Sequence, residues 1–135
     1  RFIEVFARRG LVVDFSGSWI LPRIIGVQKA KQLMMTASEI NGTMLNDYGV
    51  LYKLVAKSDL DNELNNLVSL LDKQSFISIC MIKDQIRKGL NTNFDESLTN
   101  ETNNQNSRFV HSDVMEGMSA FIEKRQPEYK NTLDE

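Results

Sequence analysis

The chain opens on a dense apolar pattern, Phe2-Ile3-x-Val5-Phe6, that predicts a short strand over residues 2–6. A second run of this kind, VLYKLV at residues 50–55, predicts another strand. Most of the remaining chain carries apolar residues three and four positions apart, the spacing of a helix with one buried face. The pattern therefore predicts a mostly α-helical protein with a few short β-strands.

Between the two predicted strands, we expect three short helices. Ser16 or Ser18 can cap the first, which tolerates Pro22 only near its first turn and ends at about residue 25. Apolar spacing predicts the second over residues 27–36. Asparagine is a favourable capping residue and glycine a common terminator, so the third is expected over residues 41–48.

From Ser58 onward, the pattern is helical. Ser58 and Asp61 resemble a capping box at the start of a helix. That helix carries an apolar stripe made by Leu60, Leu64, Leu67, Val68 and Leu71. Residues 76–90 predict another helix, apolar nearly all round in its first half and therefore expected to be buried. Cys80 lies in that half and is interpreted as a core residue rather than a nucleophile, since no base lies near it in sequence.

The last third of the chain is less regular. Residues 91–107 are rich in Asn and Thr and form either a weak helix or a mobile connection. His111, the only histidine, is interpreted as a surface or capping residue before the final helix, and Asp113 with Glu116 as a capping pair within it. One face of that helix carries Met115, Met118, Phe121 and Ile122. Residues 129–135 read as a polar tail.

Composition narrows the classes of function. A net charge of −2 without a dense Lys/Arg cluster argues against binding to nucleic acid, and the apolar runs are too short to span a membrane. A single cysteine excludes an internal disulfide, which fits a cytoplasmic protein. No His/Cys/carboxylate spacing predicts a metal site. Because the chain begins at Arg1 inside an apolar pattern, we interpret it as a fragment.

The most promising stretch for chemistry is residues 10–23, GLVVDFSGSWILPR. It contains one carboxylate, Asp14, between Val12, Val13 and Phe15. An acid in apolar surroundings tends to have a raised pKa, which suits a general acid or base near neutral pH. The alternative is structural, because aspartate is also a common turn or capping residue before a helix.

Residues 10–23 resemble the signature of the crotonase superfamily, the enoyl-CoA hydratase/isomerase enzymes, roughly G-L-x-P-D-x-G-G-[ST]-x-x-L-P-R. The stretch YGV at residues 48–50 and the closing EGMSAFIEKR at residues 116–125 follow in the family's order. The resemblance covers almost the whole chain. It departs from the family at Val13, where proline is usual, at Ser16, the first glycine of the pair, and at Ala37, the glycine of a "TG" turn.

The resemblance implies the C-terminal half of a crotonase-like fold, the α/β superhelix of the ClpP/crotonase class. Residues 1–57 would end the core and carry the active-site loop, and residues 58–135 would form a helical oligomerisation region of a homo-trimer or hexamer. Most of the β-spiral and the two N–H groups of the oxyanion hole would come from a preceding half. This polypeptide alone is therefore expected to be inactive.

The resemblance also assigns residues to an acyl-CoA site that needs no cofactor or metal besides the thioester substrate. Phe6 stands where hydratases have a second catalytic glutamate, whereas Asp14 matches the aspartate that isomerases use. The family likeness thus favours an enoyl-CoA isomerase acting through Asp14. Phe15 and Trp19 line an acyl pocket or pack in the core, and Lys124 reaches a CoA phosphate or caps a solvated helix end. The alternatives are an enoyl-CoA hydratase of fatty-acid β-oxidation and a non-catalytic CoA-binding module.

Overall fold

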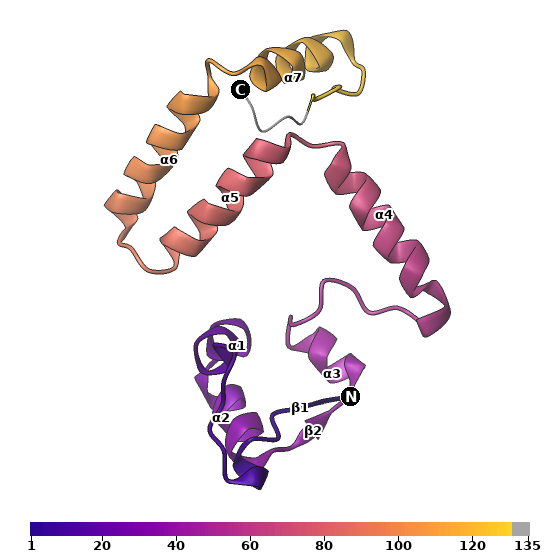
Figure 1. The fold of residues 1–135 in the computed structure, drawn as a ribbon, viewed down its shortest axis with the longest axis vertical. Helices are drawn as coiled ribbons and strands as arrows, with labels where there is room; N and C mark the ends of the chain where they lie inside the picture. Colours follow the sequence, from indigo (N-terminus) through magenta and orange to yellow (C-terminus); the bar gives the residue numbers. More distant parts are fainter. Residues whose placement is uncertain (131–135) are drawn as a thin grey trace. The chain divides into compact units, whose positions relative to one another are not determined.

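Seven α-helices, two short strands and two 3-10 turns make up the part of the chain that the computed structural model describes, residues 1–130. The predicted fold class, mostly helical with few strands, is confirmed (Figure 1). Contacts divide the chain into two compact parts, which we call the N-terminal unit, Arg1–Leu60, and the C-terminal unit, from Asp61 onward. The predicted polar tail extends into residues 131–135, which lie outside the described residues.

The sheet of the N-terminal unit pairs β1 (Phe2–Ile3) with β2 (Glu39–Ile40) in antiparallel orientation. Phe2 lies opposite Ile40 in this register. The strand predicted over residues 50–55 is wrong, because that stretch has no regular structure. Its first N–H, on Val50, donates to the Leu45 carbonyl at the end of a helix instead of to a neighbouring strand. A β-prone sequence without a partner edge gains no ladder of hydrogen bonds.

Three helices complete this unit: α1 (Gly17–Ile25), α2 (Val27–Thr36) and α3 (Gly42–Asp47). They agree closely with the predicted ranges. Their apolar faces meet in a small core formed by Leu21, Ile25, Ala30, Leu33 and Ile40. As predicted, Asn41 caps α3, its side chain accepting the Met44 N–H at 2.9 Å. The unit therefore buries its core between α1, α2 and β2.

Two local predictions in the N-terminal unit are wrong. Pro22 lies in the second turn of α1 rather than the first, where its ring removes one donor from the helix. Ser58 lies in a 3-10 turn, Lys57–Asp59, and its hydroxyl donates to the Asp59 carboxylate at 3.0 Å instead of capping the next helix. The other 3-10 turn, Ala7–Arg9, follows β1.

The C-terminal unit is built from α4 (Leu60–Asp72, which begins at the boundary), α5 (Phe76–Gly89), α6 (Phe94–Arg108) and α7 (Ser112–Glu123). The α6 helix settles the two alternatives for residues 91–107 in favour of a helix, and Asn93 caps it by accepting the Glu96 N–H at 2.9 Å. Helices α5 and α6 lie side by side (Figure 1).

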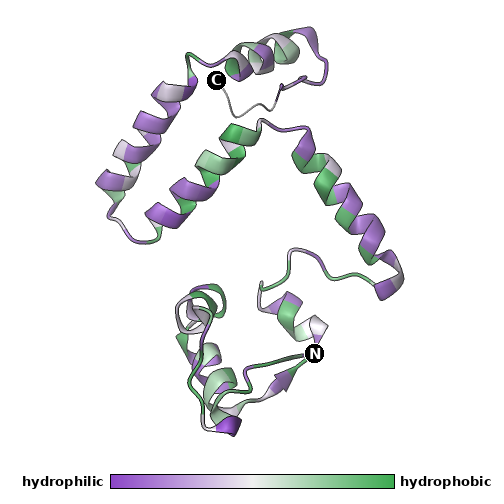
Figure 2. Ribbon diagram, viewed as in Figure 1, coloured by the Kyte–Doolittle hydropathy of each residue, from purple (hydrophilic) through white to green (hydrophobic). Residues whose placement is uncertain are grey.

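Many apolar side chains of these helices are exposed. The green segments of the ribbon in Figure 2 mark where apolar residues lie along the helices. The prediction that α5 is buried is wrong for the described chain, because no residue of α5 is buried and Cys80 is exposed. On α7 the predicted apolar face exists but is open, with Met115 and Phe121 67% and 80% exposed. None of the described helices combines the length and apolar character needed to cross a membrane.

Candidate active site

The loop that carries Asp14 joins the 3-10 turn to α1. Gly10 has a φ of +71°, and the chain turns back there, so that the Leu11 N–H donates to the Phe6 carbonyl at 3.0 Å. At the other end, the Asp14 carbonyl accepts the Gly17 N–H at 2.8 Å. Both ends of the loop are thus tied by backbone hydrogen bonds, and Asp14 itself lies directly beside the start of α1.

Phe15 and Ser16 adopt left-handed conformations, with φ of +47° and +61°. Residues with a Cβ are strained in this region, and glycine is not. The loop thus keeps the backbone shape that glycine favours, although serine replaces the first glycine of the family pattern. Gly17 is needed for a different reason, because a Cβ there would lie only 2.7 Å from Cγ1 of Val13.

We predict that Ser16→Gly stabilises the protein by about 1 kcal/mol, because glycine removes the strain of a positive φ. Ser18→Gly is the matched control. Ser18 lies inside α1, where glycine costs roughly 0.5 kcal/mol or more. Urea unfolding of both variants measures the two effects, and equal destabilisation by both would contradict the strain assigned to Ser16.

The expected shelter around Asp14 is wrong for the described chain. Asp14 is exposed, and its neighbours Val12 and Phe15 are 87% and 94% exposed. Only Val13 turns inward, where it contacts Gly17. The physical reason is that the loop lies on the surface of its unit, so apolar neighbours in sequence do not become apolar neighbours in space. The catalytic role of Asp14 stays a prediction, now without burial as its support.

A second carboxyl group, that of Glu4, lies close enough to Asp14 for their charges to interact. Burial and then the charge of Asp14 raise the pKa of Glu4 above its usual range. Glu4 is half-buried at the end of β1. Sequence reasoning missed it, and the available signal was a single charged residue inside the apolar run of residues 2–6. Glu4 and Asp14 thus place two carboxyl groups near each other at the Asp14 loop.

The two pocket residues predicted in the N-terminal unit, Phe15 and Trp19, differ in their contacts. Phe15 is almost fully exposed, so the alternative of core packing is wrong for it in the described chain. Trp19 is 38% exposed and carries the Arg23 guanidinium 3.8 Å from its ring centroid. Arg23 also donates to the Trp19 carbonyl at 2.8 Å.

Lys124 lies at the end of α7, in a left-handed conformation with φ of +56°. The predicted capping pair of Asp113 and Glu116 is wrong, because His111 caps α7 instead. Glu116 accepts two hydrogen bonds from the Arg125 guanidinium, at 2.6 and 2.9 Å, and a third from the Glu128 N–H at 2.7 Å. The acid therefore fastens the chain beyond Lys124 to the side of the helix.

The Arg125 guanidinium, with the Glu128 N–H, lowers the pKa of Glu116 from 4.5 to about 2. A lowered folded-state pKa adds stability above the unfolded value, and that stability is lost as the pH falls through the folded value. We therefore predict that Glu116→Gln lowers the Tm at pH 7, and that the deficit shrinks between about pH 5 and pH 2. Glu101→Gln, on the exposed side of α6, is the control. A deficit that stays constant down to pH 2 would contradict the assignment.

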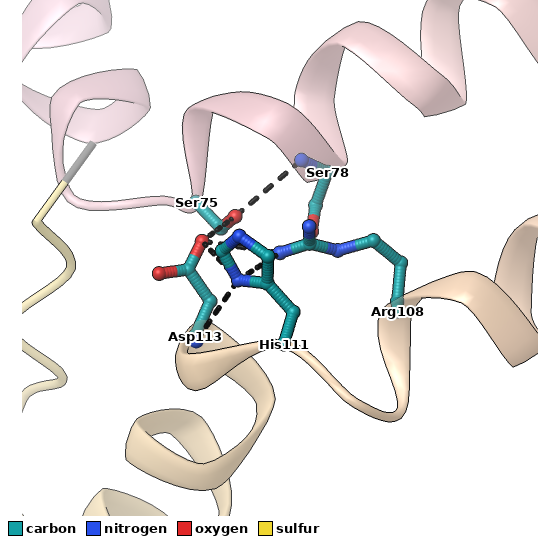
Figure 3. A network of polar contacts seen from close by, with 5 residues as sticks. All are labelled: Ser75, Ser78, Arg108, His111 and Asp113. Carbon is teal, nitrogen blue, oxygen red and sulfur yellow. Dashed lines mark hydrogen bonds and ion pairs between the residues drawn. The ribbon is translucent and has the colours of Figure 1, made fainter. Parts of the chain in front are cut away.

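A buried polar network joins the start of α5 to the end of α6 and the start of α7 (Figure 3). The Ser75 hydroxyl donates to Asp113 Oδ2, which also accepts from Arg108 at 3.2 Å. His111 Nδ1 receives the Asp113 N–H at 3.2 Å and lies 2.9 Å from the Arg108 guanidinium, confirming the predicted capping role. Sequence reasoning missed the network, since Ser75 and Asp113 are distant in sequence.

A hollow of about 390 Å³ lies beside α5 in the C-terminal unit. None of the predicted site residues contributes to it. Its lining residues are Phe76, Ile77, Cys80, Met81, Asp84 and Asn104. The hollow is mainly the uncovered apolar side of α5.

A family model described as enoyl-CoA hydratase/isomerase matches residues 1–132. The trans-2-decenoyl-[acyl-carrier-protein] isomerase of Streptococcus mutans is 31% identical over 129 residues, 96% of this chain and 49% of that protein. The short-chain-enoyl-CoA hydratase of Clostridium acetobutylicum is 30% identical over 132 residues, 97% of this chain and 51% of that protein. The chain therefore spans about half the length of the curated relatives it matches.

Solved structures give the same result for the fold. The crystal structure of an enoyl-CoA hydratase from Polaromonas sp. JS666 superimposes with a TM-score of 0.90 at 27% sequence identity. The match covers 96% of this chain and 50% of that chain. The predicted likeness to part of a larger fold is thereby confirmed.

Proposed function

The chain belongs to the enoyl-CoA hydratase/isomerase family, and we propose that its protein is an enoyl-CoA isomerase in which Asp14 is the general base and acid. The observation that carries this proposal is a contrast between two positions. By the family resemblance, Phe6 matches the position of the second hydratase glutamate, and a phenylalanine cannot transfer a proton. Asp14 stands at the position of the isomerase aspartate, on a loop tied at both ends by backbone hydrogen bonds. The whole protein's activity is part of the proposal.

In the proposed reaction, the Asp14 carboxylate removes a proton from the α-carbon of a 3-enoyl thioester. The C–H electron pair moves into a dienolate whose negative oxygen is stabilised by N–H donors of the oxyanion hole. Asp14, now protonated, returns the proton to the γ-carbon and the thioester carbonyl re-forms. The double bond has then moved by one position, with no net change in atoms or electrons. One carboxyl group is sufficient for both transfers.

The surroundings of Asp14 support this chemistry in two ways. A second carboxyl group, Glu4, lies close enough that the charge of Asp14 helps to raise the pKa of Glu4, so two acids lie near each other here. The exposed side chains of Phe15 and Trp19 supply apolar surface for an acyl group. Apart from the Asp14 loop, the family resemblance offers Lys124 of the C-terminal unit as a cation for a CoA phosphate. The substrate is therefore proposed to be an acyl-CoA thioester, with no further cofactor.

An enoyl-CoA hydratase is the alternative, and it is favoured by the hydratase named above among the relatives. Hydration would require catalytic acids other than Asp14. A non-catalytic CoA-binding module is the third possibility.

The test is to assay the protein, as its gene encodes it, for double-bond migration and for hydration. Each acyl chain is supplied on CoA and on acyl-carrier protein, since one relative is named for the latter carrier. Migration without hydration supports the isomerase, and hydration alone contradicts it.

We further propose that the protein assembles as a homo-trimer or hexamer through its C-terminal helices. The exposed apolar face of α7 supports this, because such faces are normally covered in an assembly. A reducing, cytoplasmic location fits the single exposed cysteine. Light scattering of the purified protein measures the assembly directly, and a monomeric mass would contradict it.

A further inference from the structure

We propose that Glu116 and Arg125 are positioning residues that hold Lys124 in place to pair with a phosphate of coenzyme A. This inference rests on the proposed function, in which the substrate is a CoA thioester. It concerns how the ammonium group is directed, and neither Glu116 nor Arg125 is proposed to touch the substrate.

The backbone turns sharply at Lys124. Helix α7 ends at Glu123, and Lys124 has a left-handed conformation with φ of +56° and ψ of +40°. Its N–H donates to carbonyls of the last helical turn, and the next N–H, of Arg125, donates to the Ala120 carbonyl at 3.0 Å. A residue with a Cβ is strained here, so the turn persists only where neighbouring contacts enforce it.

Those contacts converge on Arg125. Its guanidinium makes a two-pronged pair with Glu116, at 2.6 and 2.9 Å, and its Nε donates to Glu123 at 2.6 Å. Two parallel hydrogen bonds fix the orientation of an arginine as well as its distance. Glu116 also accepts the Glu128 N–H at 2.7 Å, so the same carboxylate holds the chain on both sides of Pro127.

The returning chain lies close against α7. The Tyr129 hydroxyl is 3.0 Å from the position that a Cβ on Gly117 would occupy. Residues 125–129 are therefore packed along the helix rather than projecting from it. This leaves Lys124, which is exposed, at the corner where the chain reverses.

The charges around this corner are divided in a way that suits anion binding. Arg125 has its hydrogen bonds directed at Glu116 and Glu123, so both of those carboxylates face an arginine. Lys124 presents a compact cation on a fixed backbone, and a lysine binds phosphate as a point charge. Loss of the Glu116 to Arg125 pair would release the turn and let the ammonium sample many directions.

The test compares KM values for an acyl-CoA and for the same acyl group on pantetheine, which lacks the nucleotide phosphates. The protein is used as its gene encodes it. Lys124→Ala is expected to raise the KM for acyl-CoA about tenfold, equivalent to about 1.4 kcal/mol. Glu116→Gln is expected to raise the KM for acyl-CoA roughly three- to tenfold, which is no more than the loss of the Lys124 contact itself. The rise should be confined to acyl-CoA, because acyl-pantetheine has no phosphate for Lys124 to bind. Asp84→Asn, which disturbs an exposed ion-pair cluster on α5, is the control.

The outcomes separate the two levels of the account. If Lys124→Ala leaves the preference for CoA unchanged, the proposed phosphate contact is wrong and the positioning role falls with it. If Lys124→Ala removes the preference but Glu116→Gln does not, the contact stands and the positioning role is overturned. An equal rise of KM for both substrates also overturns it, because that is a general structural effect. Should Glu116→Gln fail to fold, Arg125→Lys keeps the charge but loses the two-pronged geometry and decides the question in the same way.

Discussion

Replacing Asp14 with asparagine is expected to lower the kcat for double-bond migration by about 10²- to 10⁴-fold, the usual contribution of a general acid or base. Asparagine has nearly the same shape but cannot accept the α-proton. The backbone bond from Gly17 to the Asp14 carbonyl does not involve the side chain, so the loop should keep its form. The KM should therefore change little. Steady-state kinetics on a 3-enoyl-CoA measure the effect.

Asp47→Asn is the matched control, since Asp47 is another exposed aspartate of the N-terminal unit, at the end of α3. It should leave the kcat unchanged. Glu4→Gln is expected to give a smaller loss, because it removes a neighbouring acid and leaves Asp14 in place. A variant Asp14→Asn with full activity in both migration and hydration would exclude the proposed site.

Replacing Asp113 with alanine is expected to destabilise the protein by about 3 kcal/mol or more, the usual cost of removing one partner of a buried ion pair. The side chains of Arg108 and Asp113 are 11% and 9% exposed. Alanine would leave the Arg108 charge buried, and the Ser75 hydroxyl would lose its acceptor. The start of α5 and the junction of α6 with α7 would be loosened together. Urea unfolding followed by circular dichroism measures the loss.

Asp84→Ala provides the comparison for this second prediction. Asp84 also pairs with cations, Arg87 at 2.6 Å and Lys88 at 2.6 Å, but these pairs are on the surface of α5. Exposed pairs of this kind contribute little. Equal losses from the buried and the exposed aspartate would mean that the network in Figure 3 does not organise the C-terminal unit.

Local signals in the sequence predicted much of the secondary structure. The cap at Asn41 was predicted and observed, because capping depends on a residue and its neighbours three positions away. His111 was likewise interpreted as a possible cap, and it caps α7. The overall fold came from the family resemblance and not from periodicity, since the apolar faces of these helices do not by themselves define what they pack against.

Contacts between distant residues were beyond this kind of prediction. Asp113 reads as a helix-start residue, yet its side chain bonds Ser75 across the unit. The strand expected over residues 50–55 does not form, because that stretch pairs with neither β1 nor β2. Asp14 was expected in an apolar shelter because valine and phenylalanine flank it, but an exposed loop turns those side chains outward. Glu4 is not identified from the sequence, because the spacing of residues along the chain gives no signal that it lies near Asp14.

The most direct measurement of the central claim is the uptake of solvent deuterium by an acyl-CoA thioester in D₂O, followed by NMR. Because Asp14 is exposed, the proton that its carboxyl group holds can exchange with D₂O before it is returned. If Asp14 carries the proton, the wild-type protein therefore incorporates deuterium into a 3-enoyl-CoA at the α- and γ-carbons, and Asp14→Asn does so at least about 100-fold more slowly. Exchange at the wild-type rate in Asp14→Asn would show that another group moves the proton.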